Sequence, residues 1–187
     1  MAALLTFLRP FGLSLLLFPV GLSTHEIAHL AIYSALGVTA VLQVTQWHLG
    51  LPALSRVAIF GLHAAPLSSG NVPLPALVLN NGLGPLLAAV PLLVLWLASS
   101  RRSRAVRAAL LANVFVLLFF SGIEVSYPLL EEIGHMDADV LLAPELNYGV
   151  ALLILLAGSV VVAWRAGPRL RVVPADARGT AGRLPAP

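Results

Sequence analysis

The sequence predicts an all-α membrane protein with four transmembrane helices and a short β-like connection between the first two. Hydrophobic residues make up 59% of the 187-residue chain, charged residues only 10%, and the mean hydropathy is +0.93. Four apolar runs are long enough to cross about 30 Å of hydrocarbon at about 1.5 Å per helical residue. We therefore expect one membrane domain over residues 1–165, followed by a disordered cytoplasmic tail at 166–187.

The predicted spans lie at about 11–36, 75–98, 106–125 and 147–164. Arginines gather in "SSRRSRAVR" after the second span and in "WRAGPRLR" at the end of the fourth. Such clusters mark the cytoplasmic side of a membrane protein. Both termini are then expected inside the cell, and the two longer connections outside.

Composition bears on localisation and partners. The eleven basic residues are all arginine, a usage typical of GC-rich bacterial genes, so we expect a multi-pass protein of the bacterial cytoplasmic (inner) membrane. The chain has no cysteine, which excludes disulfides and thiol chemistry. The net charge of +3 comes from arginines beside apolar spans, so the expected partner is the lipid bilayer and not nucleic acid.

The connection between the first two spans, at 37–74, is long for a helix turn and too apolar for a solvated loop. The stretches "VTAVLQVTQW" and "RVAIFGLHA" within it alternate and are rich in β-branched residues. This pattern predicts two short strands at the membrane surface. A strand with a free edge there would offer an extended peptide a partner for pairing.

The main chemical signal is "THEIAH" at residues 24–29, inside the first apolar span. On a helix, His25 and His29 lie about 40° apart around the axis, so both imidazoles can converge on one ion, while Glu26 lies beside it. This H-E-x-x-H arrangement is typical of zinc hydrolases, in which the glutamate acts as general base. A chain of this composition would contain about 0.0035 copies by chance.

A catalytic zinc site needs a third protein ligand. The candidates should lie near the outer membrane face, because His25 is about 20 Å into a helix that begins inside. The outer connection holds "EEIGHMDAD", and from it we predict Asp137 as the ligand, with Asp139 or His135 as alternates.

Other interpretations of the histidine pair remain open. Intramembrane histidines can be structural or can bind haem, as in a non-catalytic membrane subunit. The chain also contains two Glu-x-x-His pairs, "EIAH" and "EIGH", and the further carboxylates Glu124 and Glu145. Such a set is typical of di-iron carboxylate bundles, which would make the protein a membrane oxidoreductase.

The stretch "HEIAHLAIYSALG" and the later "NNGLGPLLAAVPLL" resemble the site-2 protease (M50) family of intramembrane metalloproteases. The resemblance implies one Zn²⁺ per chain, held by His25, His29 and an aspartate near 137, with Glu26 as general base. It also implies that Asn80 and Asn81 could bind substrate, although an interhelical hydrogen bond explains such residues equally well. The expected function is a zinc-dependent, peptidase-like hydrolase acting on a transmembrane or membrane-proximal peptide.

Overall fold

A computed structural model describes residues 2–48, 58–67, 72–99, 101, 103–133 and 144–165. The chain forms four helices and one hairpin, in the order α1 (Ala2–Ala35), β1 (Ala40–His48), β2 (Ala58–Pro66), α2 (Leu74–Ala98), α3 (Arg104–Ile133) and α4 (Pro144–Arg165). The two strands pair antiparallel, with Ala40 opposite Pro66 and Leu42 opposite Ala64. Both predicted strands are therefore confirmed.

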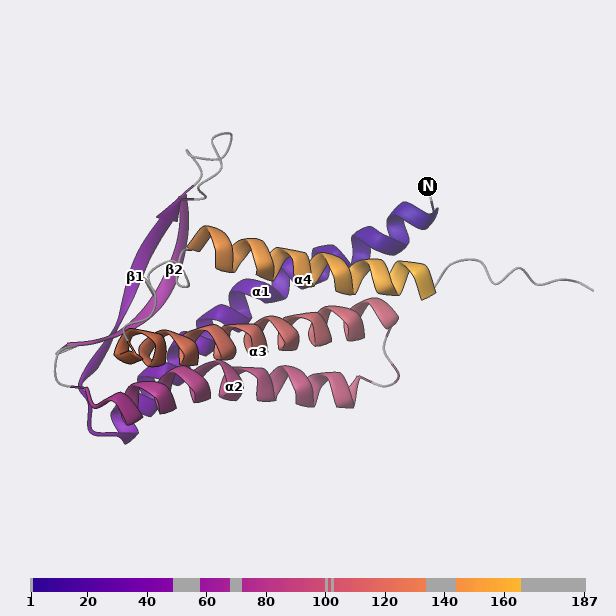
Figure 1. The fold of residues 1–187 in the computed structure, drawn as a ribbon. Coiled ribbons are helices and arrows are strands. Elements are labelled where there is room, and N and C mark those ends of the chain that lie inside the picture. The colour runs from indigo at the N-terminus through magenta and orange to yellow at the C-terminus, as the bar shows by residue number, and fades with distance from the viewer. Residues whose placement is uncertain are drawn as a thin grey trace, which may run out of the picture.

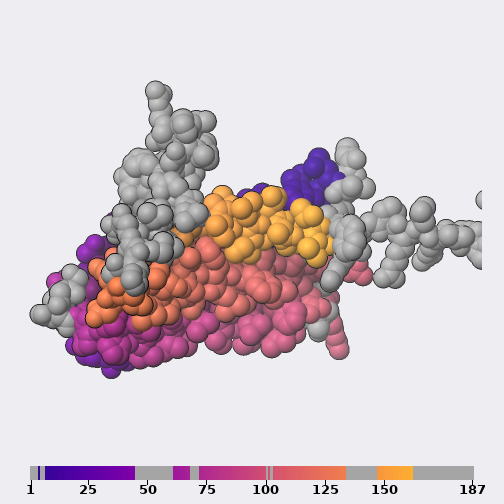
Figure 2. Space-filling model, viewed as in Figure 1, coloured from indigo at the N-terminus to yellow at the C-terminus, as the bar shows by residue number. Residues whose placement is uncertain are grey.

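The helices form one bundle with the hairpin at one end (Figure 1). α2, α3 and α4 run alongside one another, and α1 crosses them obliquely. The hairpin lies where α1 ends and α2 begins, while the N-terminus and the turn between α2 and α3 lie at the opposite end. Figure 2 shows α2, α3 and α4 packed along most of their length on one face.

Three helices are long and apolar enough to cross a membrane, at Phe7–Ala35, Leu74–Ala98 and Arg104–Ile133. Many of their large apolar side chains point outward, among them Leu16 (72% exposed) and Leu97 (61%). Water would penalise this surface and lipid would not. The structure thus supports a mostly helical membrane protein with three candidate spans, and the apolar stretch of α4, Asn147–Val161, is shorter.

The bundle core consists of two clusters that share α3. One joins α2 to α3 through small and branched side chains, including Ala88, Leu92 and Leu117. The other joins α3 to α4, where Ala151 and Leu155 are fully buried. Because α3 contributes to both clusters, it is the most enclosed of the three candidate spans.

α1 ends in a hydrogen-bonded cap that turns the chain into the hairpin. Gly37 has φ +73°, a conformation that glycine adopts without steric cost. The N–H of Val38 donates to the Tyr33 carbonyl at 2.9 Å, and the N–H of Gly37 donates to the Ser34 carbonyl at 3.1 Å. This is the Schellman arrangement, and it fixes where β1 begins relative to the histidines on α1.

Two predicted boundaries differ from the structure. The first helix begins at Ala2, nine residues before the expected start at Phe11, and passes through Pro10. The third was expected to end near residue 125 but continues to Ile133, through Pro128. A proline inside a helix leaves the carbonyl four residues earlier without its usual donor. For Pro128 that carbonyl belongs to Glu124.

Candidate metal centre

Two helices bring three potential metal ligands together. His25 and His29 lie one turn apart on α1, and their Nε2 atoms are 2.6 Å from each other. The Glu124 carboxylate reaches them from α3, 3.0 Å from His29 Nε2 and 3.2 Å from His25 Nε2. One ligand atom from each of these residues lies within 4.8 Å of the others. The predicted convergence of the two imidazoles is thus seen.

The burial and chemistry of these groups fit a zinc ion. His25 and His29 are 3% and 6% exposed, so both rings are removed from solvent. Two imidazole nitrogens and a carboxylate are a donor set used by catalytic zinc sites, with the fourth position left for water. Both Nε2 atoms would have to turn from each other toward a shared ion, which would replace the hydrogen bond between them.

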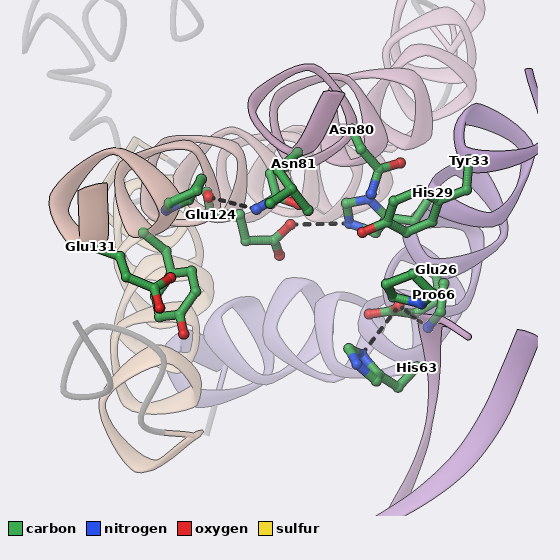
Figure 3. A pocket seen from close by; sticks show the side chains of 13 residues that line it. Glu26, His29, Tyr33, His63, Pro66, Asn80, Asn81, Glu124 and Glu131 are labelled. Atoms are coloured by element: carbon green, nitrogen blue, oxygen red, sulfur yellow. Dashed lines mark hydrogen bonds and ion pairs between the residues drawn. The ribbon is translucent and has the colours of Figure 1, made fainter. Parts of the chain in front are cut away.

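The surroundings of His29 depend on residues of α2. A Cβ atom at Gly84 would lie 2.5 Å from His29 Nδ1 and 2.8 Å from Nε2, so no side chain fits at that position without moving the ring. Asn80 is 1% exposed and lies beside His29, as Figure 3 shows. The "NNGLGP" segment therefore allows α2 to approach α1 at the level of the histidines.

Glu26 points away from the three clustered groups, toward the hairpin. Its Oε2 atom accepts a hydrogen bond of 2.8 Å from the N–H of Ala64 and lies 3.7 Å from His63 Nδ1. The N–H of Leu67 donates to the carbonyl of Thr39 on the neighbouring chain segment. The Leu67 N–H therefore points toward β1. Because successive N–H groups along a strand point in opposite directions, the Ala64 N–H, three residues earlier, points away from β1. Glu26 therefore occupies part of the outer edge of β2.

A cavity of about 310 Å³ connects Glu26 with the clustered groups. It lies between α1, β2, α2 and α3, and Figure 3 shows its side chains converging from these elements. Such a volume has room for several water molecules beside polar groups. Its polar lining consists of Glu26, His29, Tyr33, His63, Asn80, Asn81, Glu124, Tyr127 and Glu131.

The third member of the cluster, Glu124, was not the ligand that the sequence favoured. Asp137, Asp139 and His135 lie outside the described residues, so their assignment stays a prediction. Glu124 entered the sequence interpretation only as an iron ligand. The signal that could have found it is its place as the only charged residue between positions 108 and 130. An ionisable residue deep in a membrane span usually has a function.

The two asparagines expected to bind substrate both face the interior. Asn80 and Asn81 line the cavity, which agrees with their predicted placement. The Asn81 side chain donates a hydrogen bond of 2.9 Å to the backbone carbonyl of Glu124. This is the interhelical hydrogen bond that the sequence left as the alternative. Substrate binding by either residue stays a prediction.

The described residues do not assemble a second metal position of the di-iron type. Glu132, from the second Glu-x-x-His pair, is exposed at the end of α3, while His135 and the side chain of Glu145 lie outside what the structure describes. Searches of protein-family models, curated proteins and solved structures gave no match to this chain. The case for a function therefore depends on the geometry of the site.

Proposed function

We propose that the protein is a zinc-dependent, peptidase-like hydrolase embedded in the membrane, with His25, His29 and Glu124 as the ligands of one zinc ion. The observation that supports this most is the convergence of two buried imidazoles and one carboxylate inside an apolar bundle. Burial of ionisable groups in a membrane protein is costly, and an ion would compensate it. The adjacent cavity would admit water and substrate.

The chain's own groups would divide the chemistry between them. When bound, zinc supplies the Lewis acidity that makes water nucleophilic near neutral pH. Glu26 would accept the proton that the attacking water loses, because it lines the same cavity as His29 and Glu124. The Ala64 N–H holds the Glu26 carboxylate at the cavity wall. Asn80 would contact the substrate from α2.

A peptide is the substrate class that the hairpin favours. β2 borders the cavity through His63, Ala64 and Pro66. An extended peptide could pair with the part of its outer edge that Glu26 leaves free, since main-chain hydrogen bonding at a free strand edge does not depend on sequence. The catalytic groups lie inside the bundle, so the peptide would come from a transmembrane or membrane-proximal segment.

Metal analysis of the purified protein tests the proposal. We expect about one zinc per chain, and its loss in His29→Ala, because two remaining ligands hold zinc poorly. Without an ion, the same contacts describe a hydrogen-bonded His–His–Glu cluster in a non-catalytic protein. Protein purified without chelators that contains no zinc would support that alternative, and two irons per chain would support the di-iron one.

For the topology, we propose four spans in the bacterial cytoplasmic membrane with both termini in the cytoplasm. Arg101 and Arg104 lie at the turn between α2 and α3, at the same end of the bundle as the N-terminus (Figure 1). A reporter fused after residue 166 should therefore be active only in the cytoplasm. If α4 did not cross the membrane, reporters at the two ends of the chain would lie on opposite sides.

A further inference from the structure

Pro128 leaves a gap in the hydrogen bonding of α3 at the metal centre. Proline has no N–H, so the backbone carbonyl four residues earlier, that of Glu124, lacks the donor that residue 128 would otherwise supply. α3 nevertheless continues without interruption from Arg104 to Ile133. The unpaired carbonyl thus belongs to the residue whose side chain meets His25 and His29.

Asn81 of α2 fills this gap. Its Nδ2 atom donates to the Glu124 carbonyl at 2.9 Å, and Figure 3 shows the contact crossing from α2 to α3. Nearly all buried carbonyls in proteins find a donor, and leaving one unpaired costs free energy. The side chain of one helix therefore replaces the missing backbone donor of the other.

The two helices are held closely at the same level by further contacts. The Ser121 hydroxyl donates to the Gly82 carbonyl at 2.9 Å. A Cβ atom at Gly82 would lie 2.9 Å from Val125 Cγ2, so a side chain at this position would require Val125 to move. These contacts hold α3 against α2 at the level of Glu124, and from that position the carboxylate reaches both histidines.

We propose that Asn81 is a positioning residue for the metal centre, acting through the Glu124 carbonyl that Pro128 leaves free. The proposal rests on the proposed zinc site, and it assigns to Asn81 a function other than substrate contact. Fixing the backbone from which a ligand projects preorganises the site, as outer hydrogen bonds do for metal ligands generally. Zinc binding should depend on Asn81 only while residue 128 lacks an N–H.

A double-mutant cycle tests this dependence. Zinc affinity is measured by chelator competition on the full chain in detergent for the wild type, Asn81→Leu, Pro128→Ala and the double variant. Asn81→Leu keeps a similar size but removes the donor, and should weaken zinc binding by about 10- to 100-fold. In the Pro128→Ala background, the backbone N–H of residue 128 can pair with the Glu124 carbonyl. Asn81→Leu should then weaken zinc binding by less than about threefold.

A matched control separates positioning from general destabilisation. Asn113 is 1% exposed, and its Nδ2 atom donates to the carbonyls of Ser14 and Ala109, away from the metal centre. Asn113→Leu should lower the thermal midpoint but change zinc affinity less than about threefold. The proposal would be overturned if Asn81→Leu weakened zinc binding equally with Pro128 and with Pro128→Ala, or weakened it in neither background.

The cycle also distinguishes failure of this inference from failure of the zinc site. If the wild type binds no zinc, the proposed function fails, and the same four proteins are compared by thermal unfolding. Asn81→Leu should then lower the midpoint by several degrees with Pro128 present and by clearly less with Pro128→Ala. Equal shifts in the two backgrounds would show that Asn81 does not compensate for the proline.

Discussion

Replacing Glu124 with glutamine should weaken zinc binding by at least about 100-fold, equivalent to ~2.7 kcal/mol. The amide keeps the size of the carboxylate and can still hydrogen-bond to His25 and His29, but it loses the negative charge and the strong donor oxygen that zinc requires. Chelator competition on the purified protein measures the change. Far-ultraviolet circular dichroism should stay close to that of the wild type.

Two further variants make this result specific. Glu131 is exposed and lines the same cavity, so Glu131→Gln removes one negative charge nearby without touching the histidines. It should leave zinc affinity within about threefold of the wild type. Asp137→Ala tests the ligand that the sequence favoured. If Asp137→Ala loses zinc while Glu124→Gln retains it, the three-ligand site proposed from the structure is wrong.

The elements of the fold that could be predicted are those with a strong local signal. The apolar runs predicted the helices, and alternating β-branched residues predicted both strands of the hairpin. The end of α3 was misplaced because the predicted span was bounded by the length of the apolar run, whereas the helix continues through Pro128 to Ile133. The Glu124 carbonyl, which Pro128 leaves without its usual helical donor, accepts a hydrogen bond from Asn81, 43 residues earlier in the chain and on another helix. No local pattern contains that contact.

The candidate site shows the same division between local and distant information. His25 and His29 could be paired from the sequence because the helical repeat alone puts them on one face. Glu124 lies 99 residues from His25, and only the packing of α3 against α1 brings them together. The contact between Glu26 and β2 likewise depends on how the hairpin folds back on α1. The spacing within H-E-x-x-H predicts that Glu26 lies near the ion, but not what holds it there.

Glu26→Gln should abolish hydrolysis while keeping the zinc. Glu26 is not among the three clustered residues that could hold the zinc, so we expect zinc affinity within about threefold of the wild type. The amide can still accept the hydrogen bond from the Ala64 N–H, so the side chain should stay at the cavity wall. It cannot accept a proton from water, and removing a general base costs about 10²- to 10⁴-fold in rate.

The measurement is cleavage of a synthetic transmembrane peptide by the zinc-loaded protein in detergent, followed by gel electrophoresis, with zinc content determined on the same samples. His63→Gln is the matched control, because the His63 side chain is 54% exposed and its Nδ1 atom lies 3.7 Å from the Glu26 carboxylate. It should retain most of the activity. Activity in Glu26→Gln equal to that of the wild type would remove Glu26 as the base, whereas zinc loss together with activity would make it a ligand. If zinc-loaded wild-type protein cleaves no transmembrane peptide, the peptidase assignment loses its support while the proposed metal centre stands.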